Sequence, residues 1–359
     1  MSSKKDFGRK VVIGIHNTYI NEQTKKLLVD FQPNIILFGG AIKSKQQVKK
    51  LIIYINSLYD EGNKPFIACD VEGGQGRNGT GKNRGVNRLA GKEGFEGIGT
   101  MSAYEMGQLT RSFKQNSIIG KIDESFTKIE AESLAKAKAL KDVGIHSGLD
   151  IVIDLDLGNP IISDLGRAAS NDVGAVFDIM LTKQYANQEV GIASCIKHLW
   201  GHGSSNVDSH KGTSIMKDEH FEQEVKAFEM AFEHCHLPMV MASHLICPQI
   251  DEELPCSLSK KCLQKARKMD FDGIIISDDI FMRALSDHYS IEEIYKNFFD
   301  AGGDMMIIGK PDYAQNFFNK SLYEMLEVGA NMLDDWVFDW REREESEYRL
   351  SNFYHNYVA

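Results

Sequence analysis

The segment 196–212 has the residue types of a site for proton transfer. An apolar run ends in Lys197-His198, and a glycine-rich loop with two further histidines and an aspartate follows. Glycine permits backbone conformations that other residues avoid, so such a loop can change its shape. Asp208 and His210 lie two residues apart on this loop. Because a carboxylate orients an imidazole and imidazole titrates near neutral pH, we predict that this pair transfers protons.

Five apolar runs in the chain, this one included, end in ionisable or hydroxyl side chains. One such residue can be explained as a buried aspartate held by backbone amides, or as a hydrogen-bonded core histidine. Five together are hard to explain in this way, because burial of unpaired charge is unfavourable. We therefore predict a polar pocket for a hydroxyl-rich ligand. The residues are Asp70 and Glu72, Asp154 and Asp156, Lys197 and His198, Ser243 and His244, and Ser277, Asp278 and Asp279, while the last run ends less informatively in Gly309-Lys310.

A metal site is the main alternative for the histidines. His198 and His202 are four residues apart, with Asp208 and His210 close by. The intervening glycines argue against the helix that such a spacing needs. Metal-dependent barrel hydrolases typically carry a His-x-His pair after their first strand, whereas this chain has only His16 there. We expect neither a metal nor a cofactor.

The elements that position these residues can be predicted from hydrophobic patterning. Short apolar runs that end in glycine or polar residues are typical of parallel strands buried on both faces. The chain has eight of them, at 11–15, 35–38, 65–69, 151–157, 193–196, 239–242, 273–276 and 305–308.

Helical patterns lie between most of these strands. In 45–59, for example, Val48, Leu51, Ile52 and Ile55 follow the 3.6-residue period of a helix. Strand–helix alternation with eight strands predicts an α/β fold, a single-domain (β/α)₈ barrel, whose active site lies at the carboxyl ends of the strands. A doubly wound sheet fits less well, because no G-x-G-x-x-G motif follows the first strand. The other predicted helices are 22–30, 124–143, 218–233 and 259–269.

No Pro- or Ser-rich linker divides the chain, so we predict one domain over 1–359, with a core of about 10–310 and a helical extension at 311–359. The connection 73–120 is irregular and glycine-rich, which predicts a binding loop or a disordered segment. The charged run 341–345 predicts a solvated helical face. We expect Trp336 and Trp340 to pack on the barrel.

The motifs of residues 10–310, taken in order, resemble glycoside hydrolase family 3, and specifically its single-domain β-N-acetylglucosaminidase branch. The most specific part is Lys197-His198 with Gly201-His202-Gly203 and Asp208-Ser209-His210. The remaining matches are Asp70-Val71-Glu72-Gly73-Gly74, Asn159-Pro160 with Gly166-Arg167, Met241-Ala242-Ser243-His244, and Ser277-Asp278-Asp279.

This resemblance implies a retaining glycosidase that releases terminal β-linked N-acetylglucosamine from peptidoglycan-derived muropeptides. Asp278 would be the nucleophile, with Asp208 and His210 as the acid/base pair. The resemblance places the sugar hydroxyls against Asp70, Arg167, Lys197 and His198, with His244 nearby. Strand alternation predicts that only one of Asp278 and Asp279 faces the pocket, and the resemblance favours Asp278.

Two residues depart from the family pattern. Gln75 replaces an arginine after Glu72-Gly73-Gly74, which bears on which substituent of the substrate is recognised. Trp200 replaces a proline, and its ring would either stack on a sugar or pack in the protein. Two other functions therefore stay open: a family 3 β-glucosidase or β-xylosidase, and a sugar-binding barrel without catalysis.

Composition restricts the partners of the protein. With 359 residues and 42% hydrophobic residues the chain can form a large core, and its net charge of −10 argues against nucleic acid and anionic membranes. No run approaches the length of a membrane span, and the charged N-terminus lacks the apolar segment of a signal peptide. Six cysteines without a CxxC pair predict buried, reduced thiols. We expect a cytoplasmic protein with a small carbohydrate substrate, and the oligomeric state stays open.

Overall fold

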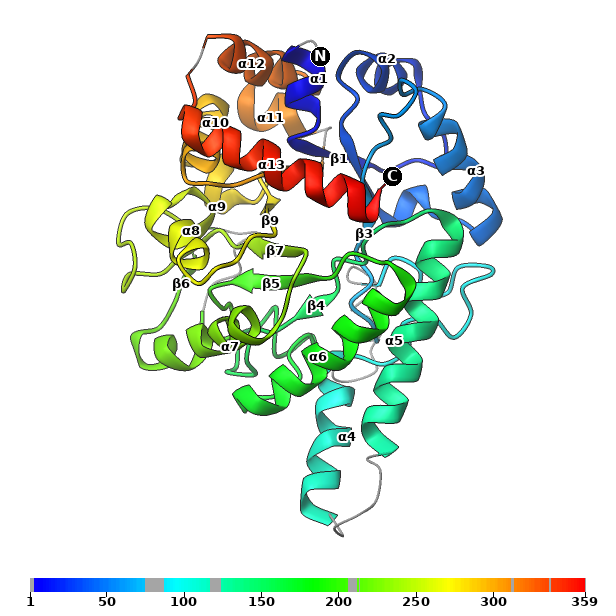
Figure 1. Ribbon diagram of the computed structural model, residues 1–359, viewed down its shortest axis with the longest axis vertical. Coiled ribbons are helices and arrows are strands. Elements are labelled where there is room, and N and C mark those ends of the chain that lie inside the picture. Colours follow the sequence, from blue (N-terminus) through cyan, green and yellow to red (C-terminus); the bar gives the residue numbers. More distant parts are fainter. Residues whose placement is uncertain are drawn as a thin grey trace.

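The structure is a computed structural model that describes residues 3–74, 87–116, 124–205, 212, 214–310, 313–335 and 337–358. It confirms the predicted (β/α)₈ barrel. Eight parallel strands follow one another in chain order around a curled sheet, with helices outside it (Figure 1). The strands are β1 (Val11–Ile15), β2 (Asn34–Leu37), β3 (Ile67–Cys69), β4 (Ile151–Val152), β5 (Cys195–Leu199), β7 (Met239–Ala242), β9 (Ile274–Asp279) and β10 (Met305–Ile308), and β6 (Ser214–Ile215) pairs separately with β8 (Leu245–Ile246).

The sheet closes between β3 and the residues that precede β4. The amide of Cys69 donates a hydrogen bond to the carbonyl of Ser147 over 3.1 Å, and the amide of Val71 donates to Gly148 over 2.9 Å. Ala68 and Ser147 form a parallel bridge at the same place. This closure places the residues that follow β3 beside those that follow β4.

The helices begin at polar capping residues. The side chain of Ser44 accepts a hydrogen bond from the amide of Gln47, and Ser290 and Ser321 each form a reciprocal capping box with a glutamate three residues later. The helices are α1 (Ser3–Gly8), α2 (Glu22–Phe31), α3 (Lys45–Asn56), α4 (Ala103–Asn116), α5 (Glu124–Val143), α6 (Val173–Val190), α7 (Phe221–His234), α8 (Lys260–Arg267), α9 (Arg283–Ser286), α10 (Ile291–Asp300), α11 (Ala314–Phe318), α12 (Leu322–Asp334) and α13 (Trp340–Tyr357).

The last helix covers the amino-terminal end of the barrel. In Figure 1 α13 crosses in front of the strands, and its Leu350 and Phe353 join the core inside the barrel together with Val358. Polar contacts tie it to the strand starts: Arg349 Nε donates to Asp304 Oδ1 over 2.9 Å, just before β10. The opposite, carboxyl end of the barrel remains for the site.

Several expectations from the sequence can be compared with these elements. The connection 73–120 contains helix α4, so the alternative that this segment is disordered throughout was wrong. In Figure 1 α4 and α5 run side by side away from the barrel, and Ser125 Oγ donates to the carbonyl of Leu109 between them. The charged run 341–345 lies on α13 with Arg341 exposed, as predicted. Trp336 and the side chain of Trp340 lie outside the described residues.

All six cysteines are free thiols and five are buried, with Cys235 half-buried, which confirms the prediction made for them. Within the described ranges, no helix combines the length and the apolar composition that a membrane span requires.

Candidate active site

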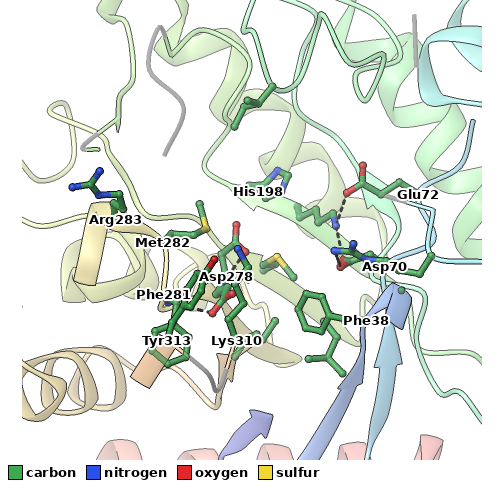
Figure 2. A pocket seen from close by; sticks show the side chains of 18 of the residues that line it. Phe38, Asp70, Glu72, His198, Asp278, Phe281, Met282, Arg283, Lys310 and Tyr313 are labelled. Atoms are coloured by element: carbon green, nitrogen blue, oxygen red, sulfur yellow. Dashed lines mark hydrogen bonds and ion pairs between the residues drawn. The ribbon is translucent and has the colours of Figure 1, made fainter. Parts of the chain in front are cut away.

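A cavity of about 1150 Å³ opens at the carboxyl ends of the strands. It is where the sequence predicts the site, and Figure 2 shows Asp278 near its centre with Asp70, Glu72 and His198 to one side. The cavity brings together five of the predicted site residues, which are Asp70, Arg167, Lys197, His198 and Asp278.

Glu72 is the carboxylate that links the cations of this cluster. Arg167 holds it with two hydrogen bonds, from Nε at 2.8 Å and Nη2 at 2.9 Å, and Lys197 Nζ lies 2.7 Å from its Oε1. Burial by itself raises the pKa of Glu72, but the charges of Arg167 and Lys197 outweigh it and hold that pKa well below its usual range. Glu72 is therefore ionised, and both cations are fixed in place.

Asp70 lies at the more open edge of the cluster. Its Oδ1 is 3.6 Å from Lys197 Nζ, and its Oδ2 accepts a hydrogen bond from Arg88 Nη2 over 3.4 Å. The guanidinium of Arg88 also lies 5.0 Å from the centre of the Phe38 ring, which stacks on His16 at 4.4 Å. A partly buried carboxylate beside an ammonium group can accept hydrogen bonds from sugar hydroxyls.

Asp154, at the end of the β4 segment, positions the ring of His198. Its Oδ2 is 2.5 Å from His198 Nδ1, and its Oδ1 accepts the backbone amides of His198 and His202, each over 3.0 Å. Arg167 Nη2 lies 3.2 Å from the other ring nitrogen of His198, Nε2. Because arginine can only donate, Nε2 is the acceptor and Nδ1 carries the proton that Asp154 accepts.

Both Asp278 and Asp279 line the cavity, so the expectation that only one of them could face it was wrong. Both residues lie in β9, but its pairing with β10 shifts register between Ile276 and Asp279, so strict alternation is interrupted there. Asp279 Oδ1 accepts the amides of Gly309, over 2.9 Å, and Phe281, over 3.2 Å. Burial raises the pKa of Asp279 to about 6. Asp278 Oδ1 accepts a hydrogen bond from the amide of Asp279 over 2.8 Å. Burial lowers the pKa of Arg167, but Glu72, and to a smaller extent Asp154 and Asp278, raise it overall.

Three side chains anchor the start of the loop that follows β5. Asp154 accepts a hydrogen bond from the amide of His202. Glu224 of α7 accepts hydrogen bonds from the amides of Gly203, over 2.8 Å, and Ser204, over 3.0 Å. The carbonyl of Ser205 accepts a hydrogen bond from Asn159 Nδ2 over 2.6 Å. The predicted acid/base residues, Asp208 and His210, lie outside the described residues, as does Gln75.

Two other residues singled out in the sequence do not lie on the cavity wall. Nδ1 of His244 is 2.7 Å from Ser257 Oγ and Nε2 is 3.2 Å from the carbonyl of Asp279, so the ring supports the end of β9. Trp200 is fully buried against Phe228, and its Nε1 donates to the carbonyl of Cys262 over 3.0 Å. Of the two alternatives for Trp200, packing in the protein is the one observed.

Sequence reasoning placed Glu72 in the predicted polar pocket without its role of linking Arg167 and Lys197, and it singled out neither Arg88 nor Glu224. Glu72 was visible in the Asp-x-Glu-Gly-Gly motif, whereas Arg88 and Glu224 follow no motif that marks them. Among the residues that the structure describes, no cluster of three or more His, Cys, Asp or Glu side chains is arranged to hold a metal ion.

Comparisons with known proteins agree with this geometry. Residues 10–337 match the family described as glycosyl hydrolase family 3 N terminal domain. The beta-hexosaminidase of Hydrogenovibrio crunogenus is 28% identical over 305 residues, which cover 83% of this chain and 78% of that protein. The beta-hexosaminidase of a Neisseria meningitidis serogroup C strain is 29% identical over 301 residues, 81% of this chain and 75% of its own length.

Solved structures share the fold. A family 3 β-N-acetylglucosaminidase from Paenibacillus superposes with a TM-score of 0.79 at 20% identity, and the match covers 99% of this chain but 62% of that one. The β-N-acetylhexosaminidase of Beutenbergia cavernae gives the same TM-score at 16% identity, over 98% of this chain and 97% of its own. Since the family match covers most of the sequence, the chain belongs to glycosyl hydrolase family 3 and is a glycoside hydrolase.

Proposed function

We propose that this protein is a retaining β-N-acetylglucosaminidase that works through a covalent glycosyl-enzyme intermediate on Asp278. The observation that carries the proposal is the cavity itself. Asp278 shares it with a paired cluster of Asp70, Arg167, Lys197 and His198, whose acceptors and donors suit the hydroxyl groups of one sugar ring. The relatives described above, which are named beta-hexosaminidases, support the same activity.

In the proposed reaction Asp278 attacks the anomeric carbon and the glycosidic bond to the leaving oxygen breaks. His210, oriented by Asp208, gives that oxygen its proton and later takes a proton from the water that hydrolyses the ester. Asp279 is the weaker candidate for the nucleophile, because two backbone amides already occupy one of its oxygens.

The proposed substrate is a muropeptide with a terminal β-linked N-acetylglucosamine, cleaved in the cytoplasm during recycling of peptidoglycan. Free thiols at all six cysteines fit a reducing compartment. The rival functions are a β-glucosidase or β-xylosidase of the same family and a sugar-binding protein without catalysis.

A panel of nitrophenyl β-glycosides tests the proposal: the N-acetylglucosaminide and the glucoside differ only at the 2-substituent, and the xyloside also lacks the hydroxymethyl group at C5. We expect efficient release of nitrophenol from the N-acetylglucosaminide and slow release from the glucoside and the xyloside. Preference for the glucoside or the xyloside would identify the other specificity. Binding of N-acetylglucosamine without turnover of any glycoside would identify a sugar-binding protein.

The Asp278→Ala variant tests the nucleophile. We expect turnover to fall to background while the circular dichroism spectrum and Tm stay near those of the wild type, because the side chain acts on the substrate and not on the core. Asp272→Ala is the matched control, since Asp272 is exposed before the opposite end of β9. Near-normal activity of the Asp278 variant would contradict the assignment.

The His210→Ala variant tests the acid. A general acid contributes about 10²- to 10⁴-fold to glycoside cleavage, and only poor leaving groups need the proton. We therefore expect kcat/KM to fall far more for alkyl or disaccharide substrates than for dinitrophenyl ones. Equal slowing across the leaving-group series would remove His210 from this role.

A further inference from the structure

The cavity continues on the far side of Asp278 from the polar cluster. Figure 2 shows Asp278 in the middle, with Asp70, Glu72 and His198 on one side and Phe281, Met282, Arg283, Lys310 and Tyr313 on the other. A volume of about 1150 Å³ lies above the roughly 300–1,000 Å³ of a typical small-molecule site, so the space holds more than one sugar ring.

The far side has a different chemistry from the polar cluster. We call it the aromatic wall, and it consists of Phe281 and Met282 after β9 and of Lys310, Tyr313 and Phe317 after β10. The Phe281 ring packs on Tyr313 at 6.4 Å and on Phe317 at 6.3 Å. Tyr313 remains 41% exposed, so part of its ring is open to a ligand.

The cations of the two sides differ in their partners. In the polar cluster Arg167 and Lys197 are both paired with Glu72. Lys310 lies over the Tyr313 ring at 5.1 Å, and its charge opposes the rise that burial causes in the pKa of Asp279, but among the described residues it forms no ion pair with a carboxylate. Its ammonium group is therefore available to an anion that enters along the wall.

The position of Asp278 divides the cavity into two subsites. If Asp278 attacks the anomeric carbon, as the proposed function requires, that carbon lies beside it at the junction of sugar and aglycone. The polar cluster then holds the sugar. The aglycone, which has to extend beyond the junction, meets the aromatic wall.

We propose that the aromatic wall binds the aglycone and that Lys310 selects aglycones that carry a carboxylate. The ligand class is a ring or short chain with an apolar face for Tyr313 and Phe317 and an anionic group within reach of Lys310. This inference rests on the proposed function, since it takes the position of the reacting carbon from it.

A matched pair of substrates isolates the charge. One is a phenyl β-N-acetylglucosaminide with a carboxylate at the 3-position of the phenyl ring, and the other has a carboxamide of nearly the same shape there. We expect the wild type to prefer the carboxylate by about 2- to 5-fold in kcat/KM, the range of a partly exposed ion pair. High salt should reduce that preference.

The Lys310→Met and Lys310→Gln variants should bring the ratio of the two kcat/KM values to about 1, whatever happens to each value alone. Lys320→Met is the control and should keep the wild-type ratio, because Lys320 faces Glu292 outside the cavity. An unchanged ratio in the Lys310 variants, with both substrates hydrolysed, would overturn this subsite alone. If the wild type hydrolyses neither substrate, the proposed function fails and the subsite fails with it.

Discussion

Asp154 sets both the orientation and the tautomer of His198. Its carboxylate accepts hydrogen bonds from the ring Nδ1–H and from two backbone amides. Because Asp154 is only 1% exposed, water cannot replace any of these three donors. Burial by itself raises the pKa of Asp154, but the His198 ring and the hydrogen bonds lower it overall. As a result Nε2 of His198 accepts a hydrogen bond in the site.

Asp154→Asn should reduce kcat/KM and also lower Tm. The amide nitrogen of asparagine can only donate, so the proton of His198 would move to Nε2, where it meets the donor Arg167 Nη2. A buried donor without an acceptor costs about 1–3 kcal/mol. The ¹⁵N chemical shifts of the His198 ring nitrogens report the tautomer directly. Unchanged shifts would show that Asp154 does not set it, and Asp156→Asn is the control on the same segment.

For single residues, the sequence could predict which side chains lie at the site but not which side chains they pair with. Asp70 was identifiable because it directly follows the apolar run of β3, and Lys197 and His198 because they follow the apolar residues that begin β5. The pairing of Glu72 with Arg167 joins residues 95 positions apart, and no local pattern marks it. The same holds for Arg88, which reaches Asp70 from a turn that sequence patterning does not position.

Among the elements, α7 holds the loop that follows β5. Glu224 is the buried side chain that does so, and burial raises its pKa to about 7 although hydrogen bonds from Ser204 and Gly203 oppose the rise. The charge of Asp154 adds to the rise, and Cys247 is a further titratable neighbour among the described residues. Ionised Glu224 is therefore costly at the start of this loop.

Glu224 should make the protein less stable as pH rises. Its pKa is near 4.5 in the unfolded chain and about 7 in the folded one, so between these values the folded state binds more protons. Its stabilising contribution is complete below pH 4.5 and is lost as pH rises through 7. The free energy of unfolding of the wild type relative to Glu224→Gln should fall over this window, by up to about 1.4 kcal/mol per pH unit.

Urea unfolding at several pH values between 5 and 8 measures this difference, and the exposed Glu222→Gln on the same helix is the control. A difference that stays constant with pH would contradict the assignment. Asp279 also titrates in this range, but it is present in both proteins, so the comparison isolates Glu224.

Elements with a simple pattern were predictable to the residue. Strands β1, β7 and β10 and helix α5 have the predicted bounds, because their hydrophobic runs or periods end at clear polar or glycine signals. Helix α6 was missed because it is buried on several sides, with Lys183, Gln184 and Asn187 among its buried residues, so it shows no single apolar stripe. Helix α4 was missed because it lies within a glycine-rich, polar stretch.

For the whole molecule, the barrel depends on α13 to cover its amino-terminal end. Asp304, fully buried, accepts Arg349 Nε over 2.9 Å and Arg267 Nη2 over 2.7 Å. Lys10, before β1, lies 2.9 Å from Glu347 of the same helix. The general pattern of strands predicted the barrel, but nothing in it indicated which segment would cover this end.

Arg349→Met should destabilise the protein without changing its catalysis. Removing a buried charged hydrogen bond costs about 1.5–3 kcal/mol, and the site lies at the other end of the strands. We expect a lower Tm and unchanged kcat/KM well below that Tm. Arg341→Met, at an exposed position of the same helix, should leave both values unchanged. Loss of kcat/KM at full folding would show that the two ends of the barrel are coupled.

The position of α13 also bears on how the protein is made in the cell. A nascent chain that has already released all eight strands from the ribosome still lacks Leu350, Phe353 and Val358, and so leaves the apolar interior of the barrel open to water at one end. Until those residues emerge, that opening is a surface to which chaperones can bind. Synthesis of α13 and Val358, and not of the last barrel strand, is then the event that closes this end of the barrel.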